Sequence, residues 1–148
     1  GNPVGWLLKN VNSSLALFKD NGVRSFSRIL IALRPGRRNQ KFIDIADKIC
    51  FHYGASLTLL NIISENQQES VSLKKTSEEL LSLTKSKSEL KIIKSNDPVE
   101  TISEESASYD LLILGTPEKD NWIRVLFSAS EDKFVKMAAC SVLRLTIK

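Results

Sequence analysis

The chain has 148 residues, 42% of them hydrophobic and 26% charged, with a net charge of +4. This length and ordinary composition fit one globular domain that needs no disulfide staples, and the mild positive charge does not point to nucleic acid as a partner. No apolar run approaches the ~20 residues that span a bilayer, and no signal-peptide pattern opens the chain, so the sequence predicts a soluble, cytoplasmic protein.

Five segments have the apolar patterns of β-strands. The first is an apolar run closed by the turn residues Arg34, Pro35 and Gly36, and the third alternates like a half-exposed strand. In chain order, the expected strands are residues 28–33, 56–63, 89–94, 110–114 and 140–147.

Helical patterns separate these strands. Apolar residues recur at i, i+3, i+4, i+7 and i+8 from Phe42 to Cys50, and Gly54 marks the end of this amphipathic helix. Asp97 followed by Pro98 is typical of a helix start, with proline in the first turn. The expected helices are residues 42–53, 67–87, 96–108 and 128–138.

The alternation of strands and helices with short connections sets the fold class. It requires right-handed crossovers and a parallel sheet with helices on both faces. The near-continuous apolar character of the first, second and fourth strands fits a sheet that is buried on both sides. The sequence therefore predicts an α/β domain in residues 28–148, with an open, doubly wound, five-stranded and mostly parallel sheet.

The first 27 residues do not fit this unit. Residues 1–9 match residues 128–136 in pattern, and residues 13–17 match residues 140–144, both at an offset of 127 positions. We interpret residues 1–27 as a remnant helix and strand of a preceding sister domain plus a linker. Chance similarity between short apolar segments is the alternative.

No catalytic or metal-binding constellation is visible in the sequence. His52 is the only histidine and has no oriented partner nearby, which favours a structural role. Cys50 and Cys140 lie far apart in apolar stretches, which favours buried free thiols in a reducing compartment. Neither a disulfide nor a metal site is expected, because no cysteine pair has ligand spacing.

The stretch from Asp110 to Thr116 combines a buried strand with a glycine. In an open α/β sheet, the end of such a strand is where the free N–H groups of the next helix bind phosphate. The loop that follows, residues 117–121, has no glycine to let the backbone approach a phosphate. The sequence predicts a strand that ends at Gly115. It also predicts that the nucleotide site beside this strand end lacks the glycines needed to bind phosphate.

The order and spacing of these segments resemble the universal stress protein family, whose fold is adenine nucleotide alpha hydrolase-like. The resemblance rests on the first strand, on Gly54 before the second, on Gly115 after the fourth and on residues 138–143 before the last. Tandem domains of this family occur free and as cytosolic tails of membrane transporters. The joint at residues 18–22 resembles the joints in such tails, which is an argument by analogy.

The chain departs from the pattern of the nucleotide-binding members, which carry Gly-x2-Gly-x9-Gly-Ser/Thr after the fourth strand. It has Gly115, but then Glu118, Ser128 and Ala129, so a carboxylate lies near the expected triphosphate path and a hydroxyl donor is lost. Arg34 stands where adenosine-binding members have an aspartate. We therefore expect neither ATP nor another cofactor.

The same rim is the place for a degenerate ligand pocket. Its candidate residues are Arg34, Arg37, Ile62, Gly115, Thr116, Ser128 and Ser130. Arginine suits phosphate or carboxylate, so a sensor of nucleotides or cyclic dinucleotides is one hypothesis, and a solvated basic loop is the simpler interpretation. The bulky residues 122–127 would either fill the vacated pocket or dock against a partner domain.

The sequence as a whole favours a non-catalytic regulatory or interaction domain, with the nucleotide sensor as the alternative function. Because family members dimerise through the last strand, the resemblance implies a sister domain or a homodimer at the edge strand from Cys140 to Ile147. We predict that strand 14–19 lies against this edge. We also expect a membrane transporter domain, of the cation/proton antiporter or amino-acid permease type, in the same full-length chain.

Overall fold

In the computed structural model, the described residues are 6, 14–19, 25–36, 39–68, 71–117 and 140–147. Only the backbone is described for residues 14–19, 116–117 and 146–147. The expected helix 128–138 and the bulky segment 122–127 lie outside the described residues.

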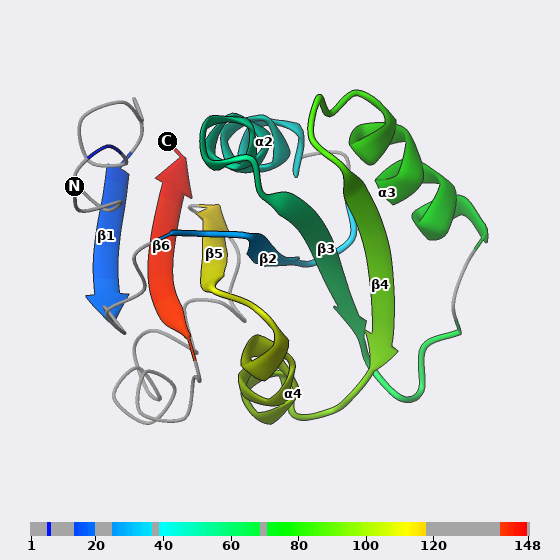
Figure 1. Cartoon of the computed structure of the whole chain (residues 1–148). Helices are drawn as coiled ribbons and strands as arrows, with labels where there is room; N and C mark the ends of the chain where they lie inside the picture. The colour runs from blue at the N-terminus through cyan, green and yellow to red at the C-terminus, as the bar shows by residue number, and fades with distance from the viewer. Residues whose placement is uncertain are drawn as a thin grey trace.

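In the described part of the chain, six strands form one sheet in the order β1-β6-β5-β2-β3-β4 (Figure 1). The strands are β1 (Ser14–Lys19), β2 (Arg28–Leu33), β3 (Ser56–Ile63), β4 (Ser88–Lys94), β5 (Leu111–Pro117) and β6 (Ser141–Ile147). The strands β2 to β6 are mutually parallel, which confirms the predicted five-stranded parallel unit. The remaining strand, β1, is added antiparallel to β6 at one end of the sheet.

Helices cover both faces of this sheet, as predicted for a doubly wound fold. The helices α2 (Gln40–Tyr53) and α3 (Val71–Ser82) lie on one face, and α4 (Pro98–Glu105) with the short 3-10 turn η2 (Ser106–Ser108) lies on the other. Phe42 and Leu80 from the first pair share a buried cluster with Ile113 of β5. Ile102 of α4 shares a second buried cluster with Leu112 of the same strand. The alternate residues of β5 therefore supply both cores.

The amphipathic helix α2 confirms the pattern that predicted it. Its buried residues are Phe42, Ile43, Ala46, Ile49 and Cys50. The helix ends at Gly54, whose φ of 67° lies in the left-handed region that glycine adopts without a steric penalty.

The expected helix 67–87 is too long at both ends. Residues 64–67 form a turn closed by a backbone hydrogen bond of 3.0 Å, and the helix α3 is described over Val71–Ser82. Beyond its end, the backbone N–H groups of Lys85 and Ser86 each donate to the carboxylate of Asp47 on α2, at 2.9 Å. This contact with a helix that is distant in sequence turns the chain toward β4. No pattern in the sequence near residues 85 and 86 predicts it.

The start of α4 is as predicted. Asp97 is the N-cap, and its side chain accepts a hydrogen bond of 3.1 Å from the backbone N–H of Glu100. Pro98 occupies the first turn, where its missing N–H costs nothing.

The prediction that the fourth strand ends at Gly115 is wrong. The strand β5 continues to Pro117, because β6 runs beside it over the same length. Gly115 pairs with Leu145 and Thr116 with Thr146. The glycine therefore lies within the sheet ladder rather than at a strand end.

The prediction that strand 14–19 lies against the last strand is confirmed. Ala16 pairs with Arg144 and Leu17 with Leu143 in the antiparallel ladder of β1 and β6. Nearby in the sequence, Trp6 stacks on His52 at the end of α2, with ring centroids 3.6 Å apart. Among the helices that the structure describes, none has the length and hydropathy of a membrane span.

Candidate functional site

The carboxyl rim between β2 and β5 is where the sheet order reverses. The chain proceeds from β2 to β3 on one side and from β5 to β6 on the other, and ligands of open α/β sheets bind in such a crevice. The pairing of β2 with β5 ends at Ala32 and Leu114, whereas β5 stays with β6 for three more residues. Arg34 and Gly115 thus lie at the place where the two strands part.

Apolar side chains fill the space beside Gly115. A Cβ atom at this position would lie 2.6 Å from Cδ2 of Leu33 and 3.0 Å from Cδ1 of Phe42. Both side chains are only 2% exposed. A side chain at Gly115 would therefore have to displace Leu33 or Phe42, so the glycine fits the core packing against the first turn of α2.

Two asparagine side chains hold the end of β2. The amide nitrogen of Asn61 on β3 donates to the carbonyl of Leu33 at 3.0 Å, and that of Asn39 donates to the carbonyl of Arg34 at 2.6 Å. Both asparagines are buried. Because these two successive carbonyl groups have side-chain donors, the loop after β2 starts in a fixed direction.

Asn61 also links the rim to α3. Its side-chain oxygen accepts a hydrogen bond of 2.7 Å from the hydroxyl of Ser77, and both residues are at most 1% exposed. Sequence reasoning missed this pair. The available signal was one amide side chain within the otherwise apolar end of the second strand, since a buried polar group needs partners.

The structure brings together only some of the predicted site residues. Arg34 is exposed just beyond β2, and Gly115 and the backbone of Thr116 lie on the neighbouring β5. Ile62 is on β3, 8% exposed, and packs in the cluster that faces α4, on the opposite face from the contacts of Gly115. The remaining candidates, Arg37, Ser128 and Ser130, lie outside the described residues.

Asp110, at the start of the glycine-containing stretch, acts at the opposite rim. Its carboxylate accepts hydrogen bonds from the backbone N–H groups of Ser27 and Arg28, at 2.8 and 2.9 Å. Its own N–H donates to the carbonyl of Arg28. These contacts clamp the start of β2 to the start of β5, so Asp110 has a structural role far from any carboxyl-rim ligand.

The cysteine and the histidine of α2 have buried or aromatic surroundings. Burial, and to a lesser extent the charge of Asp47, raises the pKa of the Cys50 thiol to about 12, so this thiol stays protonated and unreactive at neutral pH. His52 is stacked between aromatic rings, on Trp6 and edge-on to Tyr53. The described residues contain no group of three or more side chains suited to a metal ion.

Comparison with known proteins identifies the architecture. No family model and no curated protein sequence matches this chain. A universal stress protein in complex with cAMP is similar over 84% of this chain and 99% of its own, with 15% identity and a TM-score of 0.62. A universal stress protein from Archaeoglobus fulgidus in complex with dAMP is similar over 80% and 97%, with 13% identity and a TM-score of 0.55.

The chain has the universal stress protein fold. A further universal stress protein, from Archaeoglobus fulgidus DSM 4304, matches 99% of this chain with 14% identity and a TM-score of 0.67. Our chain spans 57% of that longer chain. Within the universal stress protein fold, this chain has an apolar contact at Gly115 and an exposed arginine, Arg34, at the crevice between β2 and β5.

Proposed function

We propose that this chain is a non-catalytic interaction domain with the universal stress protein fold, which acts by pairing its last strand with a sister domain. The observation that carries this proposal is the antiparallel pairing of β1 with β6. Because β1 precedes the parallel unit, it occupies the outer edge of β6 as a strand from another domain would.

The register of this pairing supports the proposal. The sequence repeat, with its offset of 127 positions, makes Ala16 the counterpart of Leu143 and Leu17 the counterpart of Arg144. Ala16 pairs with Arg144 and Leu17 with Leu143, so each residue lies opposite the counterpart of its neighbour. This is the relation that a two-fold axis creates between identical strands, as in an isologous dimer.

The length of one similar structure also favours a tandem arrangement. Five of the similar structures match 80–84% of this chain, about the share that residues 28–148 occupy. The longer Archaeoglobus fulgidus DSM 4304 protein matches 99% of it and extends further. We infer that residues 1–27 belong to a preceding sister domain.

The packing at the rim supports a role without nucleotide chemistry. Leu33 and Phe42 fill the space beside Gly115, where a phosphate-binding backbone would need to be accessible. We propose that the domain has no enzymatic activity and no resident cofactor.

We further propose that the tandem pair is the cytosolic regulatory part of a membrane transporter, of the cation/proton antiporter or amino-acid permease type. This step rests on the resemblance of the joint at residues 18–22. The complete gene tests it: the proposal requires a multi-span apolar region encoded upstream of Gly1, and a gene without one would contradict it.

Deletion of residues 1–22 tests the pairing proposal. Removal of β1 leaves the outer backbone groups of β6 without partners, and bare edges invite association. We expect the truncated protein to form larger species than the full chain at the same concentration, and to lose about 2 kcal/mol or more of unfolding free energy. Sedimentation velocity and urea unfolding measure the two effects.

A synthetic peptide of residues 1–22, added to the truncated protein, provides the matched control. It should restore both the original size and the original stability, whereas a scrambled peptide should do neither. A truncated protein that keeps the size and the stability of the full chain contradicts the pairing proposal.

The alternative function is a nucleotide sensor, which the complexes of similar proteins with cAMP and dAMP favour. Arg34 would then supply the contact to phosphate. In a thermal-shift panel of ATP, cAMP, dAMP and cyclic dinucleotides, a ligand at 100 times its Kd adds ~2.7 kcal/mol of stability. A shift that Arg34→Ala abolishes, and that Lys94→Ala retains, supports the sensor, and a flat panel contradicts it.

A further inference from the structure

The strand β4 ends the sheet on the side opposite β1, and no described strand pairs with its outer edge (Figure 1). Two backbone hydrogen bonds to β3 fix which residues face outward. Leu57 donates to the carbonyl of Lys87, and Ser95 donates to the carbonyl of Ile63, both at 2.9 Å. Since alternate residues of a parallel strand bond to alternate sides, the even-numbered residues of β4 direct their N–H and C=O groups outward.

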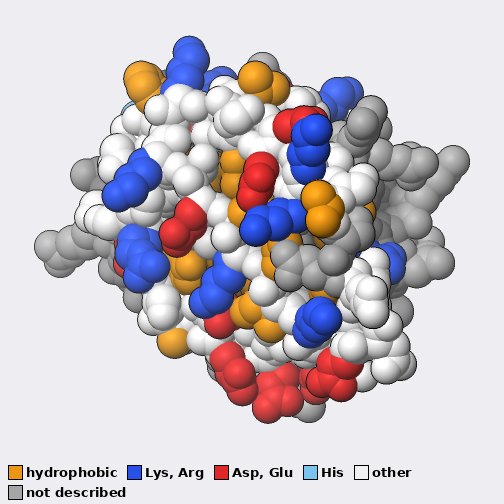
Figure 2. Space-filling model, turned by 90° about the vertical axis from the view of Figure 1, so that its right-hand side faces the viewer, with side chains coloured by type: hydrophobic (Ala, Val, Ile, Leu, Met, Phe, Trp, Pro, Cys, Tyr) orange, Lys and Arg blue, Asp and Glu red, His pale blue; other side chains and the backbone are white. Residues whose placement is uncertain are grey.

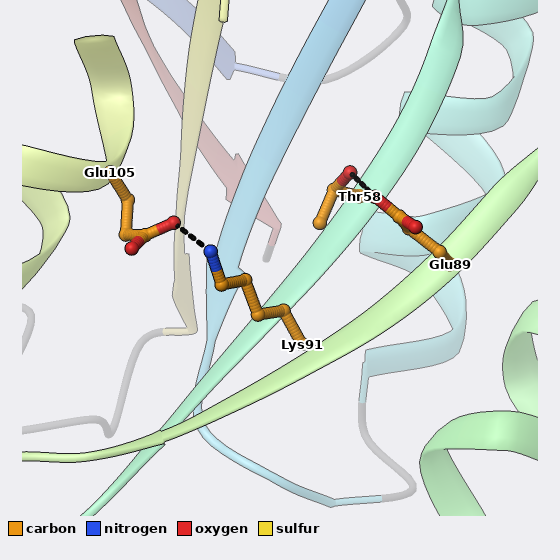
Figure 3. Close-up of polar contacts among 4 residues, drawn as sticks. All are labelled: Thr58, Glu89, Lys91 and Glu105. Atoms are coloured by element: carbon orange, nitrogen blue, oxygen red, sulfur yellow. Dashed lines mark hydrogen bonds and ion pairs between the residues drawn. The ribbon is translucent and has the colours of Figure 1, made fainter. Parts of the chain in front are cut away.

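The odd-numbered residues of β4 carry the charges next to this edge. Figure 3 shows Lys91 pointing toward Glu105 of α4, to which it donates at 2.6 Å, and Glu89 beside Thr58 of β3, from which it accepts at 3.2 Å. The hydrogen bond to Glu105 raises the pKa of Lys91 above the ordinary lysine value, because it stabilises the charged form. Glu89 and Lys91 thus carry opposite charges on the face of β4 that is turned toward α4, and each side chain also has a contact within its own chain.

This charge pattern complements itself when two copies of β4 pair antiparallel about Leu90. In that register Leu90 lies opposite its own copy, and Glu89 of each strand lies opposite Lys91 of the other. The outward backbone groups of Ser88, Leu90 and Ile92 then form the hydrogen-bonded pairs, and the charged residues occupy the non-hydrogen-bonded pairs, where side chains approach most closely.

Neighbouring registers are disfavoured by the same charges. A shift of two residues in one direction places Lys91 opposite its own copy, and a shift in the other direction places Glu89 opposite its own copy. Like charges directly opposite each other destabilise a strand pair. A lysine on an edge strand usually disfavours pairing with strands of other molecules. Here Lys91 disfavours most partner strands but fits a second copy of β4, in which Glu89 lies directly opposite it.

The other face of this edge has a hollow that a second copy would cover. A cavity of about 580 Å³ lies between α3 and β4, lined by Lys74, Glu78 and Leu81 of the helix and by Leu90 and Ile92 of the strand. Figure 2 shows the molecule from this side, with hydrophobic side chains visible between basic and acidic ones. Leu90 and Ile92 are half-buried, so apolar surface remains for a partner to cover.

We propose that two copies of this chain associate through an antiparallel pairing of β4 with β4 centred on Leu90. The sheets of the two copies then form one continuous sheet, with Glu89 of each copy beside Lys91 of the other. This surface lies at the opposite end of the sheet from β6 and is independent of the pairing of β1 with β6.

Cysteine cross-linking of the full chain tests the register. Leu90→Cys places a thiol opposite its own copy, within the Cα separation that a disulfide spans. Lys94→Cys is the matched control on the same strand and face, because the register places it roughly 27 Å from its copy. The native thiols of Cys50 and Cys140 are buried, and the unsubstituted protein sets the background. Under mild oxidation, we expect Leu90→Cys to form the covalent dimer at least about tenfold faster than Lys94→Cys.

Charge exchange provides an independent readout by sedimentation equilibrium. Lys91→Glu and Glu89→Lys should each raise the dimer Kd on the order of tenfold, and the double variant should return it to near the original value. Glu105→Gln removes the competing contact of Lys91 within the chain, so it should leave the Kd unchanged or lower it, and should not raise it. A monomer at all concentrations, equal cross-linking of the two cysteine variants, or no rescue in the double variant would each overturn the proposal.

Discussion

Replacement of Asn61 by leucine is expected to lower the free energy of unfolding by about 2–5 kcal/mol. Leucine has a similar size but cannot donate to the carbonyl of Leu33 or accept from the hydroxyl of Ser77. Both of these groups are buried, so each would lose its hydrogen-bond partner without gaining a bond to water. A buried polar group without a partner destabilises the folded state more than the loss of an exposed hydrogen bond does. Urea unfolding measures the change.

A double-mutant cycle with Ser77→Ala shows whether the two residues act together. The double variant should lose clearly less stability than the sum of the single variants, because each single change leaves the other residue's polar group unpaired. Asn96→Leu is the matched control, since Asn96 is exposed, and it should cost less than about 1 kcal/mol. Additive losses, or an Asn61 variant as stable as the original protein, would contradict the description of this rim as a buried polar link.

Gly115→Ala is expected to destabilise the protein by about 1–3 kcal/mol, which is the usual cost of adding a methyl group to a filled core. The added Cβ would lie 2.6 Å from Leu33 Cδ2 and 3.0 Å from Phe42 Cδ1. Both neighbours are packed in the cluster beneath α2, so neither can move away without displacing others.

Two comparisons make this prediction specific. Gly36→Ala adds the same methyl group in the loop after β2, where no atom of the described residues lies within 4 Å, and should leave stability unchanged or slightly higher. Combining Gly115→Ala with Leu33→Ala should cost less than the sum of the two, because the removed side chain makes room for the added one. If Gly115→Ala were as harmless as Gly36→Ala, the glycine would serve a purpose other than packing.

The parallel unit was predictable because its signals are local. Each parallel strand is an apolar or alternating run with turn residues beyond it, and Gly54 and Asp97 mark helix ends through their own backbone and side chain. The strand β1 was predictable for a different reason. The internal repeat identified it as the counterpart of the last strand, and the resemblance to a family that dimerises through that strand implied the pairing.

The details that sequence reasoning missed depend on contacts between distant residues. Asp47 determines where the chain turns after α3, although it lies on another helix. Gly115 was interpreted as a strand end, because the sequence shows neither Leu33 and Phe42 packed against it nor β6 continuing alongside. The buried link of Asn61 was visible only as one polar residue in an apolar run.

The central claim is that the carboxyl rim between β2 and β5 is packed for contact within the protein rather than for binding ATP. A titration of the full chain with ATP, followed through the backbone amide resonances of Arg34 and Gly115, tests it most directly. We expect no saturable change at either amide up to the highest soluble nucleotide concentration. A saturable shift at both amides, together with a crystal structure showing ordered phosphates beside Gly115, would contradict the claim.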